Sequence, residues 1–215
     1  MKLDPRLIAR TSLGLLNEVG LEGLTMRVVA KELDVRAPAL YWHIKGKQEL
    51  LDEMAEIMFV EAVDGLESPA RGETWQDWLL DTARRLRGGM LKYRDGARVF
   101  AGTNITHQSM YRTTELTMRT LRDAGFQPFE AARAFRALHH FVIGFTIEEQ
   151  ARIGITYTEG NPYESPLTID PVRFPLSAAA LDELWTEDTD GAFTHGVQLI
   201  IDGMAAQLER GAESA

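Results

Sequence analysis

Three consecutive residues, Tyr41, Trp42 and His43, are the first candidates for chemistry in this sequence. They belong to the stretch VRAPALYWHIKGKQELL, in which basic side chains follow the aromatic ones. Consecutive helical residues point about 100° apart, so three neighbours cannot all face one hydrophobic core. Tyr and His offer hydrogen-bond donors to a phosphate backbone, and so does the amine of Lys47. The row indicates either a nucleic-acid surface or a ring pair that closes a small core, and spacing alone does not choose between them.

A second set, His139, His140, Glu148 and Glu149, carries the imidazole and carboxylate groups of a metal-dependent enzyme. The spacing argues against that function, because His140 and Glu148 lie about two turns and roughly 80° apart on a helix. The sequence has no Gly-x-Ser-x-Gly motif and no phosphate-binding loop, and no second helix offers a His-x-x-x-His pair. We therefore expect no enzyme, no cofactor and no bound metal. The set is interpreted as a histidine pair near an interface, followed by a solvated acidic end.

The composition favours a globular cytoplasmic protein. The chain has 215 residues, 45% of them hydrophobic, and no Cys, which excludes disulfides and thiolate metal sites. No apolar run reaches the roughly 18 residues of a membrane span, and the first residues lack the apolar segment of a signal peptide. The net charge is -9, yet residues 1–50 hold eight Lys and Arg against six Asp and Glu. A nucleic-acid partner therefore fits the N-terminal segment alone, since phosphate contacts depend on local charge.

Helices must position these groups, because apolar residues recur at helical spacing almost throughout and no segment is typical of a strand. Asp4-Pro5 starts the first helix, Gly20 ends it, Thr25 caps the second, and a fourth begins near Lys47. The helix at 128–150 is apolar nearly all round, which predicts burial on most of its sides. Further helices are expected near residues 74–91, 95–101, 107–124, 176–186 and 191–210.

The first three predicted helices are short and joined by tight turns, which is typical of a helix-turn-helix unit. The third, opened by Pro38, would read the major groove, where the small residues Ala37 and Ala39 allow close approach. Arg36 at its N-terminus suits guanine or a phosphate. Part of the aromatic row would then pack between the small helices, and part would lie along the DNA backbone.

These elements predict an all-α chain with three parts. We expect a three-helix DNA-binding domain with the helix-turn-helix at residues 1–46, a connecting helix at 47–64, and a larger α-helical ligand-binding and dimerisation core at 65–215. Residues 154–175, which contain several Gly and Pro, form a long loop, and loops of this length are often functional.

Residues 15–51 resemble the DNA-binding domain of the tetracycline-repressor (TetR) family, through the motifs LTMRVVAKELDV and ALYWHIKGKQELL. The segments GETWQDWLLDTAR, YRDGARVFAGT, HFVIGFTIEEQ and AFTHGVQLIIDGM are similar to the core of the tetracycline-binding members. The resemblance implies a homodimer that binds a palindromic double-stranded DNA operator and represses transcription. The helices near 128–150 and 191–210 would form its four-helix interface. A small-molecule effector would move the fourth helix and carry the two reading helices out of register with the major grooves.

The resemblance also implies which residues contact DNA. Carried over by position, they are Thr25, Arg27, Arg36, Ala37, Pro38, Ala39, Tyr41, Trp42, His43 and Lys47. Ala37 stands where tetracycline-binding members have a base-reading Gln, and Ala39 replaces a Thr. The operator sequence is therefore expected to differ from theirs.

The expected effector site departs from the tetracycline-binding pattern at its metal. The metal-ligand His of those members falls at Phe100, whose ring cannot coordinate a hard cation. A His and an Asn that hold the drug fall at Val63 and Thr82, and an aromatic residue falls at Leu86. The replacements at Phe100, Val63 and Leu86 are more apolar than the originals. They predict a larger, more hydrophobic, metal-free effector, such as an aromatic natural product or a lipid-like metabolite.

Other candidates complete the expected pocket with apolar walls and a few oriented polar groups. Thr103 and Glu148 are retained, the latter at the family's water-mediated metal contact. The full set is Val63, Thr82, Leu86, Phe100, Thr103, Asn104, Thr117, Met118, Phe135, His139, Glu148, Leu181 and Leu184. For each of them, ordinary packing in the hydrophobic core is the alternative role.

Two other functions stay open on the same fold. One is a tetracycline–magnesium-inducible repressor of an efflux gene, which a tight tetracycline–magnesium complex would support. The other is a ligand-dependent activator or a heterodimeric partner, which the position of the operator relative to the promoter would distinguish from a repressor.

Overall fold

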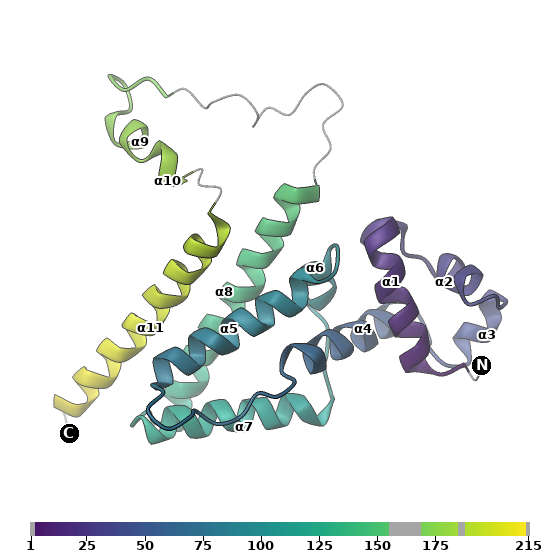
Figure 1. Cartoon of the computed structure of the whole chain (residues 1–215), viewed down its shortest axis with the longest axis horizontal. Coiled ribbons are helices and arrows are strands. Elements are labelled where there is room, and N and C mark those ends of the chain that lie inside the picture. Colours follow the sequence, from purple (N-terminus) through teal and green to yellow (C-terminus); the bar gives the residue numbers. More distant parts are fainter. Residues whose placement is uncertain (1–2, 155–168, 185–187, 214–215) are drawn as a thin grey trace.

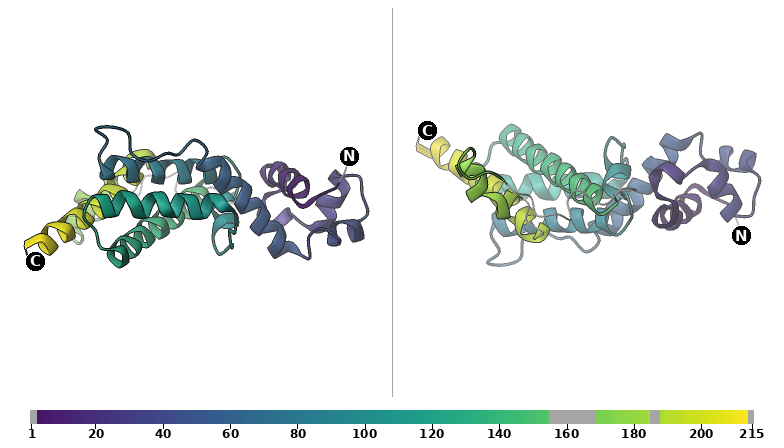
Figure 2. Two further views of the ribbon diagram at one scale, coloured as in Figure 1. Left: turned by 90° about the horizontal axis from the view of Figure 1, so that it is seen from below. Right: turned by 90° about the horizontal axis from the view of Figure 1, so that it is seen from above.

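The structure, a computed structural model, describes residues 3–154, 169–184 and 188–213, and all regular secondary structure in these ranges is helical. The molecule is elongated, with α1 to α3 at one end and the C-terminus at the other (Figures 1 and 2). The helices are α1 (Pro5–Gly23), α2 (Met26–Glu32), α3 (Ala37–Tyr41), α4 (Lys47–Ala62), α5 (Trp75–Leu91), α6 (Gly96–Phe100), α7 (Gln108–Asp123), α8 (Pro128–Gly154), α9 (Pro175–Ala179), α10 (Leu181–Leu184) and α11 (Thr189–Glu213).

The turn between α2 and α3 is closed by backbone hydrogen bonds around Asp34. Asp34 adopts the left-handed conformation, with φ of 52°, which Asp tolerates better than most residues. The N–H of Val35 donates to the carbonyl of Ala30 at 3.0 Å, and that of Asp34 donates to Lys31 at 3.1 Å. This pair of bonds satisfies the last carbonyls of α2 and sends the chain sharply into α3.

We call α1, α2, α3 and the first half of α4 the head, and α5 to α11 the body. The head has an apolar centre, continuous with the core of the body, in which Leu40 and Ile44 are fully buried. Residues from α1, α2 and α4 complete this centre: Ile8, Leu13, Leu16, Val29, Ala30, Leu50 and Met54. This shared burial holds the helices together as one unit, because α2 and α3, with 7 and 5 residues, are too short to be stable alone.

The long helix α4 joins the head to the body. Its first half packs on α1, and it also packs on α5 and α6. In the body, α5, α8 and α11 pack against one another, and α7 covers α8 (Figure 1). None of the helices in the described ranges is long and apolar enough to cross a membrane.

Three expectations from the sequence are wrong or incomplete. The helix expected at 176–186 is two short helices that meet at Ala180, with residues 185–187 outside the described part. In the single chain α8 buries one stripe, including Leu138 and Val142, while its other faces are half-buried or exposed. The first helix continues to Gly23 across a kink at Gly20. Most of the predicted 154–175 loop, residues 155–168, also lies outside the described residues.

Candidate DNA-binding and effector sites

The aromatic row at the end of α3 lies on the surface of the head. Tyr41 is 51% exposed, Trp42 is 87% exposed, and His43 is exposed as well. The alternative that the row closes a small core is therefore wrong, because none of the three residues is buried, whereas Tyr41 keeps about half of its surface covered by neighbouring residues. The reason is that α3 ends at Tyr41, and Leu40 and Ile44 on either side of the row already fill the inward positions.

The other DNA-contact candidates surround this row on the surface of the head. Arg27, Arg36 and Pro38 are exposed, whereas Ala37 and Ala39 are half-buried. Ala37 packs against the apolar centre, so less of its methyl group is available to a base than the sequence suggested. The hydroxyl of Thr25 accepts the Val28 N–H at 3.3 Å, which caps α2.

Lys47 lies at the start of α4, where its amine has a structural partner. The amine donates to the carbonyl of Leu21 at 3.1 Å, so it ties the start of α4 to the end of α1. Lys47 remains exposed, and a phosphate can share the two remaining protons of the amine.

Replacing Lys47 with alanine is expected to weaken DNA binding for all sequences and to lower the slope of log affinity against log salt by about 1, because one phosphate contact is lost. Fluorescence anisotropy with labelled duplexes at several salt concentrations measures both quantities. Lys92→Ala, which removes an exposed lysine from the body, is the matched control. An unchanged slope for Lys47→Ala would exclude a phosphate contact at this residue.

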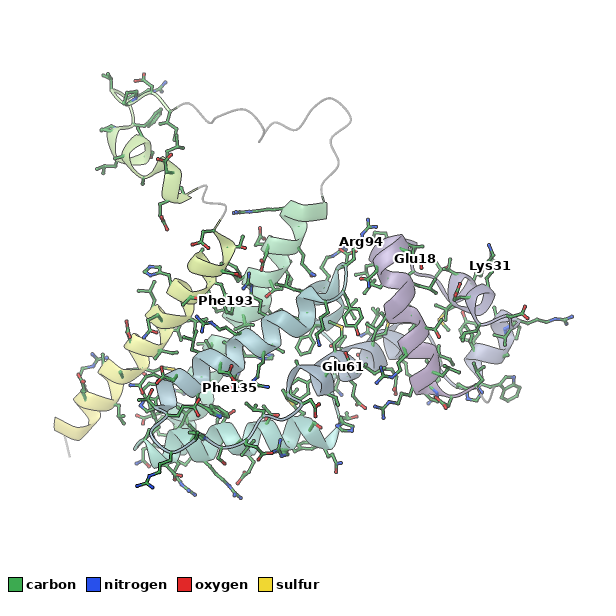
Figure 3. The ribbon with its side chains drawn as sticks, in the orientation of Figure 1. Glu18, Lys31, Glu61, Arg94, Phe135 and Phe193 are labelled. Atoms are coloured by element: carbon green, nitrogen blue, oxygen red, sulfur yellow. The ribbon has the colours of Figure 1, made fainter. Side chains whose placement is uncertain are left out.

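Hydrogen bonds to backbone groups hold the head against the body. The side chain of Asn17 accepts the Arg94 N–H at 2.8 Å, and that of Asp95 accepts the Leu21 N–H at 2.9 Å. Gly20 makes this approach possible, since its φ is 67° and an added Cβ would lie 3.2 Å from Arg94 and Asp95 side-chain atoms. Arg94 and Glu18 face each other across the junction (Figure 3).

Within the body, Gln150 of α8 binds the backbone of the α5–α6 turn, which carries the body side of this junction. Its amide nitrogen donates to the carbonyl of Tyr93 at 2.8 Å, and its amide oxygen accepts the Ala97 N–H at 2.9 Å. A cleft of about 560 Å³ opens beside it, between the end of α1 and the α5–α6 turn. Its walls carry Glu22, Asp95 and Arg98, so it is too polar and charged for the apolar effector that the sequence predicts.

Three of the predicted effector residues form an aromatic cluster inside the body. The rings of Phe100 and His139 lie 6.3 Å apart, and those of His139 and Phe135 lie 6.0 Å apart. Phe59 of α4, which the sequence analysis did not single out, stacks on Phe100 at 6.4 Å. The cluster therefore links α4, α6 and α8 directly. Its three predicted members belong to the expected effector pocket, and Phe135 is labelled in Figure 3.

The remaining candidates differ in position and burial. Val63 and Thr117 are buried, and Leu86, Met118, Thr82 and Thr103 are half-buried, with the last two hydroxyls bonded to the carbonyls of Trp78 and Phe100. Asn104 is exposed, and its N–H donates to Asp52 of α4. Glu148 and Leu184 line a separate cavity of about 280 Å³ with Phe141, Phe145 and Arg152, and Leu181 lies on α10, which projects away from the cluster (Figure 1). The single chain thus does not bring Glu148, Leu181 and Leu184 to the aromatic cluster.

Burial lowers the pKa of His139 below its ordinary value, and the neighbouring His140 lowers it further. The folded chain therefore favours the neutral imidazole. This makes the cluster an uncharged environment with one polar ring, which suits an uncharged ligand.

The lowered pKa of His139 predicts that acid destabilises the fold. As the pH falls below 6.5, His139 binds a proton in the unfolded chain but stays neutral in the folded chain. The free energy of unfolding therefore decreases as the pH falls from 6.5 toward the lower pKa of the folded state. Urea unfolding at pH 7.5 and pH 5.5 should give a larger loss for the unmodified protein than for His139→Gln. His43→Gln, which removes an exposed histidine from the head, is the control. Equal losses in the unmodified protein and His139→Gln would refute the prediction.

A buried ion pair that the sequence analysis missed joins α5, α8 and α11. Arg87 donates two hydrogen bonds to Glu149, at 2.8 and 2.6 Å, and a third to Asp190 at 2.6 Å. The bonds to Glu149 raise the pKa of Arg87. The interpretation of a solvated acidic end is therefore wrong for Glu149, which is buried, although Glu148 is exposed. No group of three or more His, Asp or Glu side chains suited to a metal occurs in the described part of the chain.

Comparison with known proteins agrees with this arrangement of head and body. Residues 8–54 match the family model described as "Bacterial regulatory proteins, tetR family", and residues 68–208 match that of the "Tetracyclin repressor-like, C-terminal domain". The chain belongs to the TetR family. It is 39% identical over 205 residues to the class A tetracycline repressor protein from transposon 1721 of Escherichia coli, covering 95% of this chain and 91% of that one.

Two solved TetR-family structures are also similar. A possible TetR family transcriptional regulator from Streptomyces coelicolor A3(2) is 37% identical, with a TM-score of 0.83, over 94% of this chain and 99% of that chain. The ActR protein of Streptomyces coelicolor, in complex with actinorhodin, is 28% identical, with a TM-score of 0.82, over 95% of this chain and 96% of that chain. The predicted family, the all-α fold and its helix-turn-helix domain are thereby confirmed.

Proposed function

We propose that the protein is a ligand-responsive transcriptional repressor, which binds a palindromic operator as a homodimer and is released by a small, hydrophobic, metal-free effector. The observation that carries the proposal is the exposed row Tyr41-Trp42-His43 on a head of TetR-family fold. Exposed aromatic rings beside basic residues cost solvation free energy in the free protein, and contact with DNA would recover it. We further propose that the protein acts in the cytoplasm, on chromosomal DNA.

The partner in the dimer would be a second copy of the chain, packed through α8 and α11. On these helices Leu199 is 60% exposed, and Phe141, Ile143 and Phe145 are only half-buried in the single chain. A four-helix interface would bury this apolar surface and place the two heads on one face of the dimer. Sedimentation should give twice the chain mass of 24.1 kDa, and a stable monomer would refute the palindromic operator.

Three functional parts follow from this proposal: a DNA-binding domain at 1–46, a connecting helix at 47–64 and an effector-binding and dimerisation core at 65–215. Support comes from α4, which packs on α1 in the head and on α5 and α6 in the body. A ligand that displaces Phe100 would press on Phe59 of α4, since the two rings are stacked. Movement of α4 would then change the distance between the two heads.

The predicted effector is metal-free because Phe100 fills the position of the metal ligand. Its ring is buried between Phe59 and His139 and offers no lone pair to a cation. We expect no tight tetracycline–magnesium complex in the unmodified protein and a partial, magnesium-dependent gain in Phe100→His. Tetracycline fluorescence with and without a chelator measures both. A tight magnesium-dependent complex in the unmodified protein would instead support the tetracycline-inducible alternative.

An affinity selection of fragmented genomic DNA from the host tests the DNA-binding half of the proposal. A single enriched palindrome, with half-sites about one DNA turn apart, is the expected result. If no DNA is enriched, the selection is repeated with protein that has been denatured and refolded without ligand. Enrichment in the repeat means that the first sample was already occupied by ligand, and no enrichment means that the protein does not bind DNA. A reporter with the enriched site placed upstream of, or within, a promoter distinguishes a repressor from the activator alternative. Enzymatic activity is not expected, because the TetR-family relatives named above are regulators.

A further inference from the structure

Leu21 lies where the backbone of α1 leaves two groups without helical partners. The helix is interrupted at Gly20, whose φ of 67° and ψ of 176° are not helical, so the N–H of Leu21 begins a new turn. The helix ends at Gly23, so the carbonyl of Leu21 belongs to its last turn. The first N–H groups and the last carbonyls of a helix need partners from elsewhere in the molecule.

Two side chains from different parts of the molecule bind these two groups. Asp95, which precedes α6 in the body, accepts the N–H of Leu21 at 2.9 Å. Lys47, at the start of α4, donates from its amine to the carbonyl of Leu21 at 3.1 Å. The backbone of Leu21 therefore connects a carboxylate of the body to an amine that is a candidate phosphate contact.

The body fixes the position of Asp95. Gln150 of α8 binds the carbonyl of Tyr93 and the N–H of Ala97, which lie two residues before and two residues after Asp95. The carboxylate of Asp95 is also largely covered, with 23% of the side chain exposed. Its place is thus set by α8 and the α5–α6 turn, and the backbone of Leu21 is bound to a fixed acceptor.

Lys47 differs from Asp95 in being exposed, and a free lysine side chain samples many rotamers. The hydrogen bond to the carbonyl of Leu21 restricts these rotamers. This lowers the entropy that the side chain loses when its amine binds a phosphate. The benefit depends on where the carbonyl of Leu21 lies, and the bond to Asp95 holds the backbone at that point.

We propose that Asp95 is a positioning residue for DNA binding, which, through the backbone of Leu21, holds the amine of Lys47 in place for a phosphate. The inference rests on the phosphate contact of Lys47 in the proposed DNA-binding function. Helix α6 follows Asp95 and ends at Phe100 of the aromatic cluster. A shift of α6 would therefore reach Lys47 by this route as well as through α4.

Asp95→Gly and Asp95→Asn form a matched pair of variants for testing this role. Both remove one negative charge and the ion pair with Arg98, and both new residues tolerate the left-handed φ of 57° at this position. Only asparagine keeps a side-chain oxygen that can accept the N–H of Leu21. A difference in DNA affinity between the two variants therefore reports on the hydrogen bond, and not on the charge.

Anisotropy titrations of the full-length variants use two labelled duplexes, one with the enriched palindrome and one of random sequence. Counterion release makes one phosphate contact worth roughly tenfold in affinity at about 0.1 M salt. We expect Asp95→Gly to bind both duplexes about threefold more weakly than Asp95→Asn, with a smaller slope of log affinity against log salt, because part of that contact is lost. In a Lys47→Ala background the two variants should bind equally, since no amine is left to position.

A merely structural role of Asp95 in holding the head would weaken DNA binding by the same factor with and without Lys47. Asn17→Ala is the control for such a role, because it removes the junction hydrogen bond to the N–H of Arg94, which does not involve Leu21. Its effect on affinity should be the same in both backgrounds. Equal affinities of Asp95→Gly and Asp95→Asn, or a difference that persists in the Lys47→Ala background, would overturn the proposal.

The same titrations separate this proposal from the repressor function. If Lys47→Ala alone binds DNA as tightly as the unmodified protein, the phosphate contact is absent and the positioning role fails with it, while an enriched palindrome still supports the repressor. If the unmodified protein binds neither duplex, the proposed DNA-binding function is refuted together with the positioning role.

Discussion

Arg87→Met is expected to lower the free energy of unfolding by about 3–5 kcal/mol, the usual cost of removing one partner from a buried ion pair. The variant would leave the carboxylate of Glu149 buried without its two hydrogen bonds from the guanidinium. It would also lose the contact of the guanidinium with the ring of Phe193, whose centroid lies 4.8 Å away. Asp190 contributes little to this value, because its side chain is 86% exposed.

Urea unfolding at a fixed protein concentration measures this loss, since a dimer's stability depends on concentration. Arg85→Met is the matched control, because Arg85 pairs with Asp81 on the exposed surface of the same helix and should cost less than about 1 kcal/mol. The double variant Arg87→Met with Glu149→Leu should recover most of the stability, since no charge is left buried. A loss of under about 1 kcal/mol in Arg87→Met would mean that water solvates Glu149 in the folded protein.

Trp42→Ala is expected to weaken operator binding by about 2 kcal/mol or more, roughly 30-fold, as for other aromatic residues at the centre of an interface. The indole is 87% exposed in the free protein, so it adds little to the stability of the head. Its removal should therefore leave the melting temperature unchanged. Anisotropy titrations with the selected operator, combined with thermal unfolding, measure the two effects separately.

The matched control for this prediction is Tyr111→Ala, which removes an aromatic residue that is 67% exposed on α7 of the body. It should change neither operator affinity nor the melting temperature. An operator affinity of Trp42→Ala within about twofold of the unmodified protein would refute the assignment of this row to the DNA interface.

Several helix boundaries were predictable from the sequence because their signals are local, whereas the end of α1 and the break at Ala180 were not. The helix expected near residues 74–91 forms, with the Asp77 N–H donating to the Thr74 hydroxyl at 3.1 Å as its cap, and it ends at Leu91. The burial of Leu40 and Ile44 followed from their spacing of four residues, which places both on one side of a helix. The exposure of all three aromatic residues between them did not, because it depends on α3 ending at Tyr41.

Long-range pairs could not be read from one sequence. Arg87 and Glu149 are 62 residues apart, and neither position carries a local signal that a charge there is buried. Phe100, Phe135 and His139 were among thirteen predicted pocket residues, and the structure brings the rings of these three together.

The way in which the head is fastened bears on how such regulators acquire new specificities. Asn17 and Asp95 accept the N–H groups of Arg94 and Leu21 across the junction, and every amino acid except proline supplies such a group. Side chains of the opposing segments can therefore be exchanged during evolution without loss of these bonds. A duplicated gene could rebuild the lining of its effector site, as at Phe100, and still inherit an intact mechanical link to the DNA-reading helices.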